Sequence, residues 1–249
     1  MTLVVAHRGA SASAPENTME AYRLAVEMGA DAIELDVHLS RDGQLAVIHD
    51  DTLDRTTDRT GPVREQSMEQ LRAADAGFTF VAPNGSTPFR DKGLRIPTLP
   101  EVLEWLPDGV GLVVELKARE ATDATVEALR GSRVRAAAAV SLISFDEKAI
   151  DQAHELDPTL PTGYLLVPSQ SFETGLAYAV EHGHAAVHPY EGDLGLDPAP
   201  KLAMALAFGR QVGCYVVNDP ERMRHLAAFG LWGFVTDRPD LGREAIGPR

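Results

Sequence analysis

The 249-residue sequence has little cysteine, little positive charge and no long apolar run, and each shortage excludes a class of protein. Its one cysteine, Cys214, cannot form an intrachain disulfide and offers no zinc-binding spacing. A formal net charge of −14 is unsuited to binding nucleic acid or an anionic membrane. No apolar stretch approaches the roughly 20 residues of a membrane span, and no basic signal-peptide region precedes one. We therefore expect a cytoplasmic protein with no membrane anchor and no nucleic-acid partner.

Short apolar segments alternate with helical patterns along most of the chain, which is typical of a parallel sheet. The expected strands are 3–6, 32–37, 45–49, 111–116, 140–144, 162–167, 185–188, 213–217 and 233–236. These are nine candidates for the eight places of a barrel, and we assign the surplus to the unit 32–50, whose connection is too short for a crossover helix. The sequence predicts one α/β domain over 1–249, a distorted TIM-type (β/α)8 barrel with a small insertion after the third strand.

The helical patterns cover 18–28, 99–105, 121–130, 146–155, 171–181, 198–208 and 220–229. Residues 51–95 interrupt the alternation, because they are polar, rich in Thr, Gly, Pro and Asp, and contain only one helix-like stretch, 67–74. So long an irregular segment in a compact domain is usually functional. We expect it to be a family insertion that lies over the barrel mouth.

Two carboxylates occur in the strand 32–37, where side chains alternate between faces with a period of two. Glu34 and Asp36 share one face, and apolar side chains occupy the other. Adjacent carboxylates in an apolar strand are costly unless a positive charge neutralises them. Together with Glu115, at the end of a later strand, they offer only hard oxygen ligands, which suit Mg²⁺ or Ca²⁺. The alternative is salt bridging to Arg8 and Lys117, although two cations cannot fully screen three acids.

The carboxyl ends of barrel strands converge on one mouth, so polar residues there are candidates for a site. Arg8 and Lys117 suit an anion such as phosphate. His7 and His49 could act as general acid and general base. The other polar residues at strand ends are Ser144, His188, Asn218 and Asp237, of which His188 could be structural or functional. We expect the remaining histidines to be solvated: His38, His154, His182, His184 and His225.

Two polar residues precede the first expected helix. Asn17 is interpreted as a helix cap, with Glu20 three residues later completing a capping-box pattern. Glu16 could cap the helix or hold Arg8 in place. Neither pattern requires a ligand.

The ordered motifs of the chain resemble those of the glycerophosphodiester phosphodiesterases. The matching segments are His7-Arg8-Gly9, Pro15-Glu16-Asn17-Thr18, Glu34-Leu35-Asp36-Val37, His49-Asp50, 51–57, 96–103, Glu115-Leu116-Lys117, Ser144-Phe145 and 236–239. They occur in the family's order over nearly the full chain. No single segment is specific, but the ordered set is.

The resemblance implies a distorted TIM barrel with an insertion after His49, and one divalent cation, Mg²⁺ or Ca²⁺, held by Glu34, Asp36 and Glu115. It also implies metal-dependent hydrolysis of small glycerophosphodiesters to glycerol 3-phosphate and an alcohol, with His7 and His49 as acid and base. In the family, a neighbouring glycerol hydroxyl is thought to attack phosphorus and give a cyclic phosphate, which water opens. The resemblance does not say which histidine is the acid.

The chain departs from the family pattern at two places. Tyr215-Val216-Val217-Asn218 stands where the family often has Trp-Thr-Val-Asn, so Tyr215 is predicted to shape the wall that holds the glycerol or the leaving alcohol. We therefore group it with Arg8, Lys117 and Glu16 as candidate substrate-binding residues. Trp232 stands in a segment where the family often has Gly-x-Asp-Gly, and we expect it to alter packing only.

Three alternatives remain open on the sequence alone. The same site could cleave lysophospholipids as a phospholipase D does, with the segment 78–81 as an apolar landing surface. The barrel could also bind a phosphorylated ligand without catalysis, or it could be an isomerase or another sugar-phosphate enzyme. The sequence predicts neither the preferred head group nor the oligomeric state.

Overall fold

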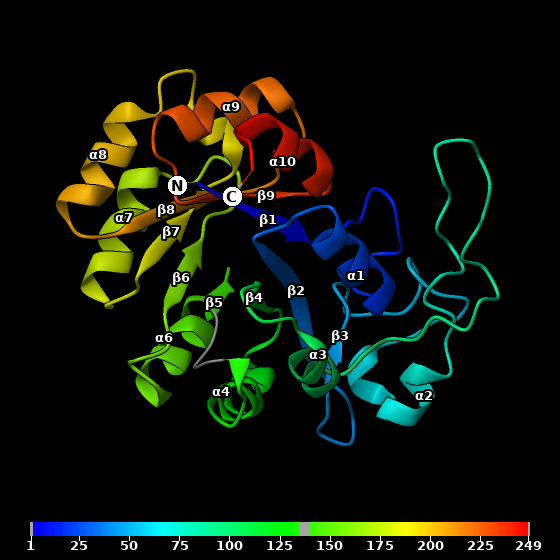
Figure 1. Cartoon of the computed structure of the whole chain (residues 1–249). Coiled ribbons are helices and arrows are strands. Elements are labelled where there is room, and N and C mark those ends of the chain that lie inside the picture. The colour runs from blue at the N-terminus through cyan, green and yellow to red at the C-terminus, as the bar shows by residue number, and fades with distance from the viewer. Residues whose placement is uncertain (1, 135–139, 249) are drawn as a thin grey trace.

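A closed barrel of eight parallel strands forms the centre of the computed structural model, which describes residues 2–134 and 140–248 (Figure 1). The strands follow one another around the barrel in chain order, and β9 pairs with β1 to close it. The predicted TIM-type fold is therefore confirmed. The barrel strands are β1 (Leu3–His7), β2 (Ala32–Leu39), β4 (Gly111–Leu116), β5 (Val140–Ser144), β6 (Thr162–Leu165), β7 (Ala186–His188), β8 (Gln211–Cys214) and β9 (Gly233–Thr236).

One further strand, β3 (Leu45–Val47), runs antiparallel to β2 and lies outside the closed ring. β2 pairs with β1 through its first residues, up to Glu34, and with β3 through its last, from Val37 to Leu39. The same edge of β2 therefore changes its partner part-way along the strand. The surplus ninth strand predicted for the unit 32–50 is confirmed.

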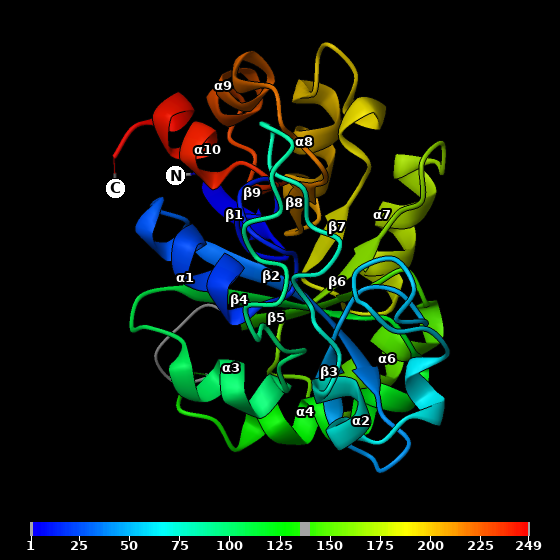
Figure 2. The ribbon, with the colours of Figure 1, turned by 90° about the vertical axis from the view of Figure 1, so that its right-hand side faces the viewer.

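Helices cover the outside of the barrel and connect successive strands (Figures 1 and 2). No helix in the described parts of the chain is long and apolar enough to cross a lipid bilayer. The helices are α1 (Met19–Glu27), α2 (Met68–Arg72), α3 (Leu99–Trp105), α4 (Thr122–Arg130), α6 (Glu147–Leu156), α7 (Phe172–Glu181), α8 (Ala199–Ala207), α9 (Pro220–Ala228) and α10 (Pro239–Ile246), with short 3₁₀ turns at Val63–Glu65, Arg119–Ala121 and Glu191–Leu194.

The period-two alternation of each strand divides its side chains between two apolar layers. Outward-facing residues such as Ile33, Leu35 and Leu112 pack against the helices in the large core. Inward-facing residues such as Val5 and Val113 fill part of the barrel interior. Polar side chains on inward positions therefore face the barrel axis, which is where the site is built.

Five strands end at different residues from those expected. β1 and β2 continue to His7 and Leu39, whereas β3, β6 and β8 stop at Val47, Leu165 and Cys214. His49 and Tyr215 consequently lie in the segments that follow strands β3 and β8. Both positions are at the carboxyl ends of the strands, so the expected convergence on the barrel mouth is unaffected.

The segment between β3 and α3 contains only α2 and one 3₁₀ turn, as its composition indicates. It has a small core of its own, in which Leu53, Met68 and Leu71 are buried together with Ile48 and Ile96. Ser67 and Gln70 form a capping box that begins α2. Figure 2 shows this segment in front of the barrel on the side from which β3 and the β1–α1 loop project. That residues 51–95 act as a cover for the mouth stays a prediction.

Gly9 sets the path of the loop that carries His7 and Arg8 toward α1. Its φ is +87°, and a Cβ added there would lie 2.6 Å from the carbonyl carbon of Ala21. We predict that Gly9→Ala lowers the free energy of unfolding by about 3 kcal/mol or more, because backbone strain and overpacking add. Urea denaturation followed by circular dichroism measures this loss.

Gly43→Ala is the matched control. Gly43 also has a positive φ, +77°, but an added Cβ would meet nothing within 4 Å. Its loss should be only about 1 kcal/mol, the cost of the left-handed backbone alone. Equal losses for the two variants would contradict the close packing of the loop against α1.

Candidate active site and metal centre

Three carboxylates meet inside the barrel near its carboxyl-terminal end. Glu34 and Asp36 come from β2, and Glu115, on neighbouring β4, pairs in register with Asp36. One oxygen from each of the three lies within 4.8 Å of the other two. Their exposed fractions are 2%, 0% and 8%, so water screens none of them well. The period-two pattern of β2 and the parallel register of β4 produce this cluster directly.

Burial and mutual repulsion oppose ionisation of this cluster. Burial, followed by the charges of Asp36 and Glu115, raises the pKa of Glu34 well above its ordinary value. Burial and the charge of Asp36 raise the pKa of Glu115 to about 7. Burial would also raise the pKa of Asp36, but the charges of Arg8 and Lys117 outweigh it and hold that pKa below its usual value. The positive charge that the chain supplies is therefore too small to keep all three carboxylates ionised.

Two cations from the chain partly compensate the cluster. Arg8 Nε lies 3.2 Å from Asp36 Oδ2, and the backbone N–H of Arg8 donates to Glu34 Oε2 at 3.0 Å. Lys117 Nζ donates to Glu115 Oε1 at 2.7 Å and lies 3.8 Å from Asp36 Oδ1. Asp36 Oδ1 itself is buried without a hydrogen-bond partner among the described residues. An unpartnered oxygen in a cluster of hard oxygen donors fits a divalent cation.

Asn17 has a different role from the helix cap that the sequence suggested. Thr18, not Asn17, caps α1 and accepts a hydrogen bond from the N–H of Ala21. The Asn17 side-chain amide instead donates to Asp36 Oδ2 at 2.8 Å, and its carbonyl accepts from the buried Tyr22 hydroxyl at 3.0 Å. The capping interpretation was wrong, because Asn17 holds a candidate metal ligand in position.

Each of the two candidate catalytic histidines is oriented by an aspartate. His7 Nδ1 is 2.7 Å from Asp237 Oδ1, and His49 Nδ1 is 2.6 Å from Asp50 Oδ1. With an ionised aspartate at Nδ1, the proton of a neutral imidazole resides there and Nε2 is left as the basic nitrogen. The Nε2 of His49 lies 3.1 Å from Lys117 Nζ. In both histidines the aspartate therefore fixes the ring and leaves Nε2 as the basic nitrogen, an arrangement that suits general acid–base chemistry.

Burial lowers the pKa of His49, as does the nearby charge of Arg8, whereas Asp36 acts in the opposite direction. Burial opposes ionisation of Asp237, but the hydrogen bond and charge of His7, together with hydrogen bonds from Asn218 and Ser11, lower the pKa of that carboxyl to about 2. Asp237 thus stays ionised and continues to accept from His7 over the whole neutral range.

Glu16 lies outside the carboxylate cluster and is bound by two arginines. It accepts from Arg8 at 2.9 Å and from two nitrogens of Arg55, both at 2.7 Å. Arg55 also donates to both oxygens of Asp50, the partner of His49. Glu16 therefore holds Arg8, as one of the two sequence interpretations had it, and Arg55 connects the inserted segment to both sides of the site. Direct contact of Glu16 with substrate stays a prediction.

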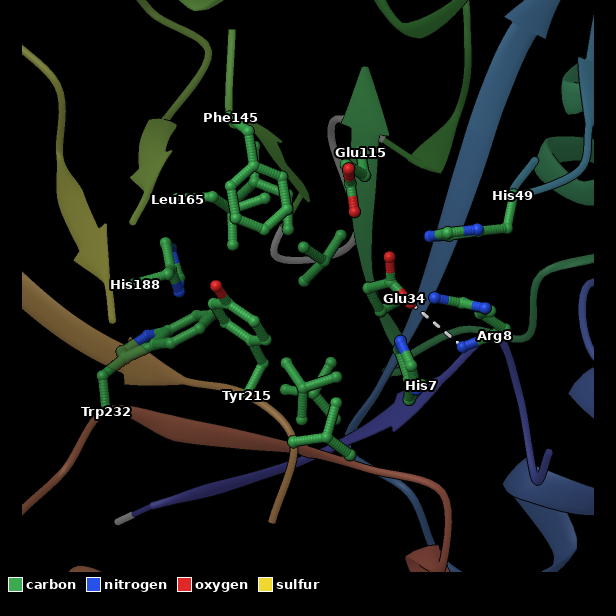
Figure 3. A pocket seen from close by; sticks show the side chains of 15 residues that line it. His7, Arg8, Glu34, His49, Glu115, Phe145, Leu165, His188, Tyr215 and Trp232 are labelled. Carbon is green, nitrogen blue, oxygen red and sulfur yellow. Dashed lines mark hydrogen bonds between the residues drawn. The ribbon is translucent and has the colours of Figure 1, made fainter. Parts of the chain in front are cut away.

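A cavity of about 250 Å³ connects these groups with an apolar wall across the barrel (Figure 3). His7, Arg8 and His49 line one side, with Glu34 and Glu115 nearest the centre. Phe145, Leu165 and Tyr215 are on the other side. Asp36, Lys117 and Glu16 do not line the cavity but support residues that do. Of the nine predicted site residues, the cavity wall includes six: His7, Arg8, Glu34, His49, Glu115 and Tyr215.

The hydroxyl of Tyr215 donates to the backbone carbonyl of Leu166. The ring of Tyr215 meets that of Phe145 edge-on at 5.6 Å, so both rings are fixed in the apolar wall. That Trp232 alters packing only stays a prediction. Although it precedes β9, its ring reaches the cavity and packs edge-on against His188 at 5.9 Å.

Two of the histidines that were expected to be solvated are buried. His38 lies within β2, because that strand extends to Leu39, and its Nε2 is 3.0 Å from the carbonyl oxygen of His49. His184 precedes β7 and lies between Thr162 and Asp151, at 2.9 and 3.1 Å. Their contacts are structural.

Three contributors to the site had no functional assignment from the sequence: Asn17, Arg55 and Asp237. All three lie in segments that match the family motifs, and Asp237 directly follows a strand. Their positions in the sequence therefore indicated that they could belong to the site. Their partners, however, come from distant parts of the chain. Asp237 is 230 residues from His7, and no local pattern encodes that contact.

Comparison with known proteins identifies this arrangement. The family model described as the glycerophosphoryl diester phosphodiesterase family matches residues 7–241. The chain belongs to this family. A glycerophosphodiester phosphodiesterase from Caldanaerobacter subterraneus subsp. tengcongensis is 33% identical, and the match covers 96% of this chain and 95% of that protein. The family resemblance inferred from the motifs is thus confirmed, and so is the class of phosphodiesterase.

Solved structures of the family agree in fold. A phosphodiesterase from Oleispira antarctica, in complex with the product sn-glycerol-3-phosphate, matches with a TM-score of 0.87 and 29% identity over 99% of this chain and 97% of that chain. A glycerophosphodiester phosphodiesterase from Agrobacterium tumefaciens matches with a TM-score of 0.81 and 32% identity over 98% and 100%. The barrel of this chain is therefore shared by members of the glycerophosphoryl diester phosphodiesterase family over nearly its whole length.

The buried imidazole of His188 makes the stability of the fold depend on pH. Burial lowers the pKa of His188 from about 6.5 to about 4. At pH values between 4 and 6.5, His188 is therefore protonated in the unfolded chain and neutral in the folded chain. Stability therefore falls as the pH decreases from 6.5 toward 4. Between pH 7 and pH 5, wild type should lose about 2 kcal/mol more than His188→Leu. Urea unfolding of both proteins at both pH values tests this, and equal losses would mean that His188 is protonated in the fold.

Proposed function

We propose that the protein hydrolyses small glycerophosphodiesters to glycerol 3-phosphate and an alcohol, with one divalent cation and with His7 and His49 as general acid and base. One observation carries the proposal: a cluster of three buried carboxylates and two aspartate-oriented histidines meet at one cavity, which Glu34, Glu115 and both histidines line, in a chain of the phosphodiesterase family. A non-catalytic barrel has no need for two histidines oriented in this way.

Glu34, Asp36 and Glu115 are the residues that would hold the cation. The fit rests on the hard oxygen donors, their mutual distances and the unpartnered Asp36 Oδ1. A bound Mg²⁺ or Ca²⁺ would supply the missing positive charge and polarise phosphoryl oxygens. Arg8 and Lys117 add two fixed positive charges beside the same place, where they favour the anionic phosphodiester and the charge that develops on it.

In the first step, the 2-hydroxyl oxygen of the glycerol forms a bond to phosphorus, and the bond from phosphorus to the leaving alcohol oxygen breaks. One histidine accepts the hydroxyl proton, and the other donates a proton to the departing oxygen. The aspartates Asp50 and Asp237 hold the two rings in orientation and stabilise whichever imidazolium forms. The product is a cyclic phosphate and a neutral alcohol.

In the second step, a water oxygen bonds to phosphorus, and the bond from phosphorus to the glycerol O2 breaks. The histidine that lost its proton in the first step accepts one from this water, and the protonated histidine returns its proton to O2. The result is glycerol 3-phosphate, and both histidines regain their initial protonation states. Arg55 links the inserted segment to Glu16 and Asp50, so we propose that residues 51–95 also limit access to this cavity.

Removal of the cation should abolish release of glycerol 3-phosphate from glycerophosphocholine, and either Mg²⁺ or Ca²⁺ should restore it after EDTA is removed. The same cation should raise the melting temperature, since it binds the folded cluster and not the unfolded chain. Asp36→Asn should increase the cation concentration for half-restoration at least about tenfold. A product assay and thermal unfolding in parallel provide the two measurements.

Asp51→Asn is the control for this comparison, because Asp51 is exposed and lies outside the three-carboxylate cluster. Its cation dependence should equal that of wild type. Full activity in EDTA without a tightly bound metal would contradict the proposed site.

His7→Ala and His49→Ala should each lower kcat on glycerophosphocholine by about 10²- to 10⁴-fold, the usual contribution of a general acid or base. A second substrate with a p-nitrophenol leaving group distinguishes their roles, since this alcohol departs without a proton. The variant that lacks the acid should recover most of its rate on this substrate, and the variant that lacks the base should not.

His225→Leu is the control, because His225 is exposed on α9, and its kinetics should match those of wild type. Wild-type activity in either His7→Ala or His49→Ala would refute the mechanism. Equal losses on both substrates for both variants would refute acid catalysis by a histidine.

A further inference from the structure

His188 projects into the barrel interior through a gap that two glycines provide. It ends β7, and Gly163 and Gly213 lie on the neighbouring strands β6 and β8. A Cβ on Gly163 would lie 2.5 Å from His188 Nε2, and one on Gly213 would lie 2.4 Å from Nδ1. A side chain at either glycine would therefore displace the imidazole. The strands are built to place this ring in the cavity.

The imidazole of His188 has no polar partner among the residues that the structure describes. Its residue is only 4% exposed, yet no hydrogen bond or ion pair to a ring nitrogen of His188 occurs within the described parts of the chain. Trp232 offers a ring and Leu165 an alkyl group, and the hydroxyl of Tyr215 is already used by Leu166. Leaving a buried donor and acceptor unpaired is costly, so a partner from the cavity is expected.

The chemistry of this partner follows from the charge of the ring. Burial keeps His188 neutral at physiological pH, with one N–H donor and one nitrogen acceptor. Such a pair suits a hydroxyl group, which both donates and accepts, better than it suits an anion. Figure 3 shows His188 across the cavity from Glu34 and Glu115, on the apolar side away from the charged groups that suit the phosphate.

We propose that His188 binds the terminal hydroxyl of the substrate's glycerol arm and thereby determines specificity for glycerol over other diols, an inference that rests on the proposed function. The reaction uses the glycerol 2-hydroxyl, so the terminal hydroxyl is the group on that arm that is free to bind elsewhere. A three-carbon arm fits the inner cavity of about 250 Å³, where its carbons meet the Tyr215 and Phe145 rings.

The test compares glycerophosphocholine with an analogue in which propane-1,2-diol replaces glycerol. The analogue keeps the hydroxyl that attacks phosphorus and lacks only the terminal one. In wild type, kcat/KM should be about 10- to 100-fold lower for the analogue. His188→Leu should lower kcat/KM for glycerophosphocholine by a similar factor and leave that for the analogue within about twofold, so that discrimination disappears. His188→Gln, which keeps a donor and an acceptor, should retain part of it.

A binding measurement makes the test independent of turnover. Inhibition by glycerol 3-phosphate and by propane-1,2-diol 1-phosphate should differ in wild type and become nearly equal in His188→Leu. His225→Leu, on the outer surface, should behave as wild type in both assays, and melting temperatures confirm that each variant is folded.

Three results would overturn the proposal: a wild type that treats the two substrates alike, a His188→Leu variant that still discriminates, or equal losses on both substrates in that variant. Equal inhibition constants in wild type would mean that only water occupies the nitrogens of His188. If wild type hydrolyses neither diester, the proposed function fails, and the two phosphate monoesters still test His188 by direct binding.

Discussion

The mutual repulsion of three buried carboxylates is the constraint on which the rest of the structure depends. Glu34, Asp36 and Glu115 are held within 4.8 Å of one another by the register of two paired strands, so they cannot separate without breaking the barrel. Positive charges and a hydrogen-bond donor surround the cluster, since Arg8, Lys117 and the Asn17 amide all contact Asp36. The charged and polar groups of the chain thus compensate the cluster only in part.

The sequence predicted the barrel and the core of this cluster because both follow from short-range periodicity. Alternation with a period of two places Glu34 and Asp36 on one face, and the carboxyl ends of parallel strands bring Glu115 to the same mouth. The surplus strand could be assigned because the link between the expected strands 32–37 and 45–49 is too short for a helix. These arguments use chain direction and spacing, and they require no knowledge of which side chains touch.

The contacts that were missed depend on side-chain direction across the barrel. Arg55 joins Glu16 to Asp50 from within an irregular segment, and nothing in its local pattern distinguishes it from other exposed arginines. The reach of Trp232 into the cavity depends on the glycine at 213, an absence of side chain on another strand. His38 was expected to be solvated because the predicted strand ended at residue 37. β2 instead extends to Leu39, since pairing with β3 rather than apolar content prolongs the strand.

The change of partner along one edge of β2 places both candidate catalytic histidines beside a single strand. His7 ends the strand that pairs with the lower part of that edge, and His49 follows the strand that pairs with the upper part. The hydrogen-bonding ladder of β2 thus carries the segments of both histidines. Met68 and Leu71 of the inserted segment pack with Ile48, the residue before His49. The inserted segment is therefore part of the support of His49, whereas His7 is held from the opposite end of the chain by Asp237.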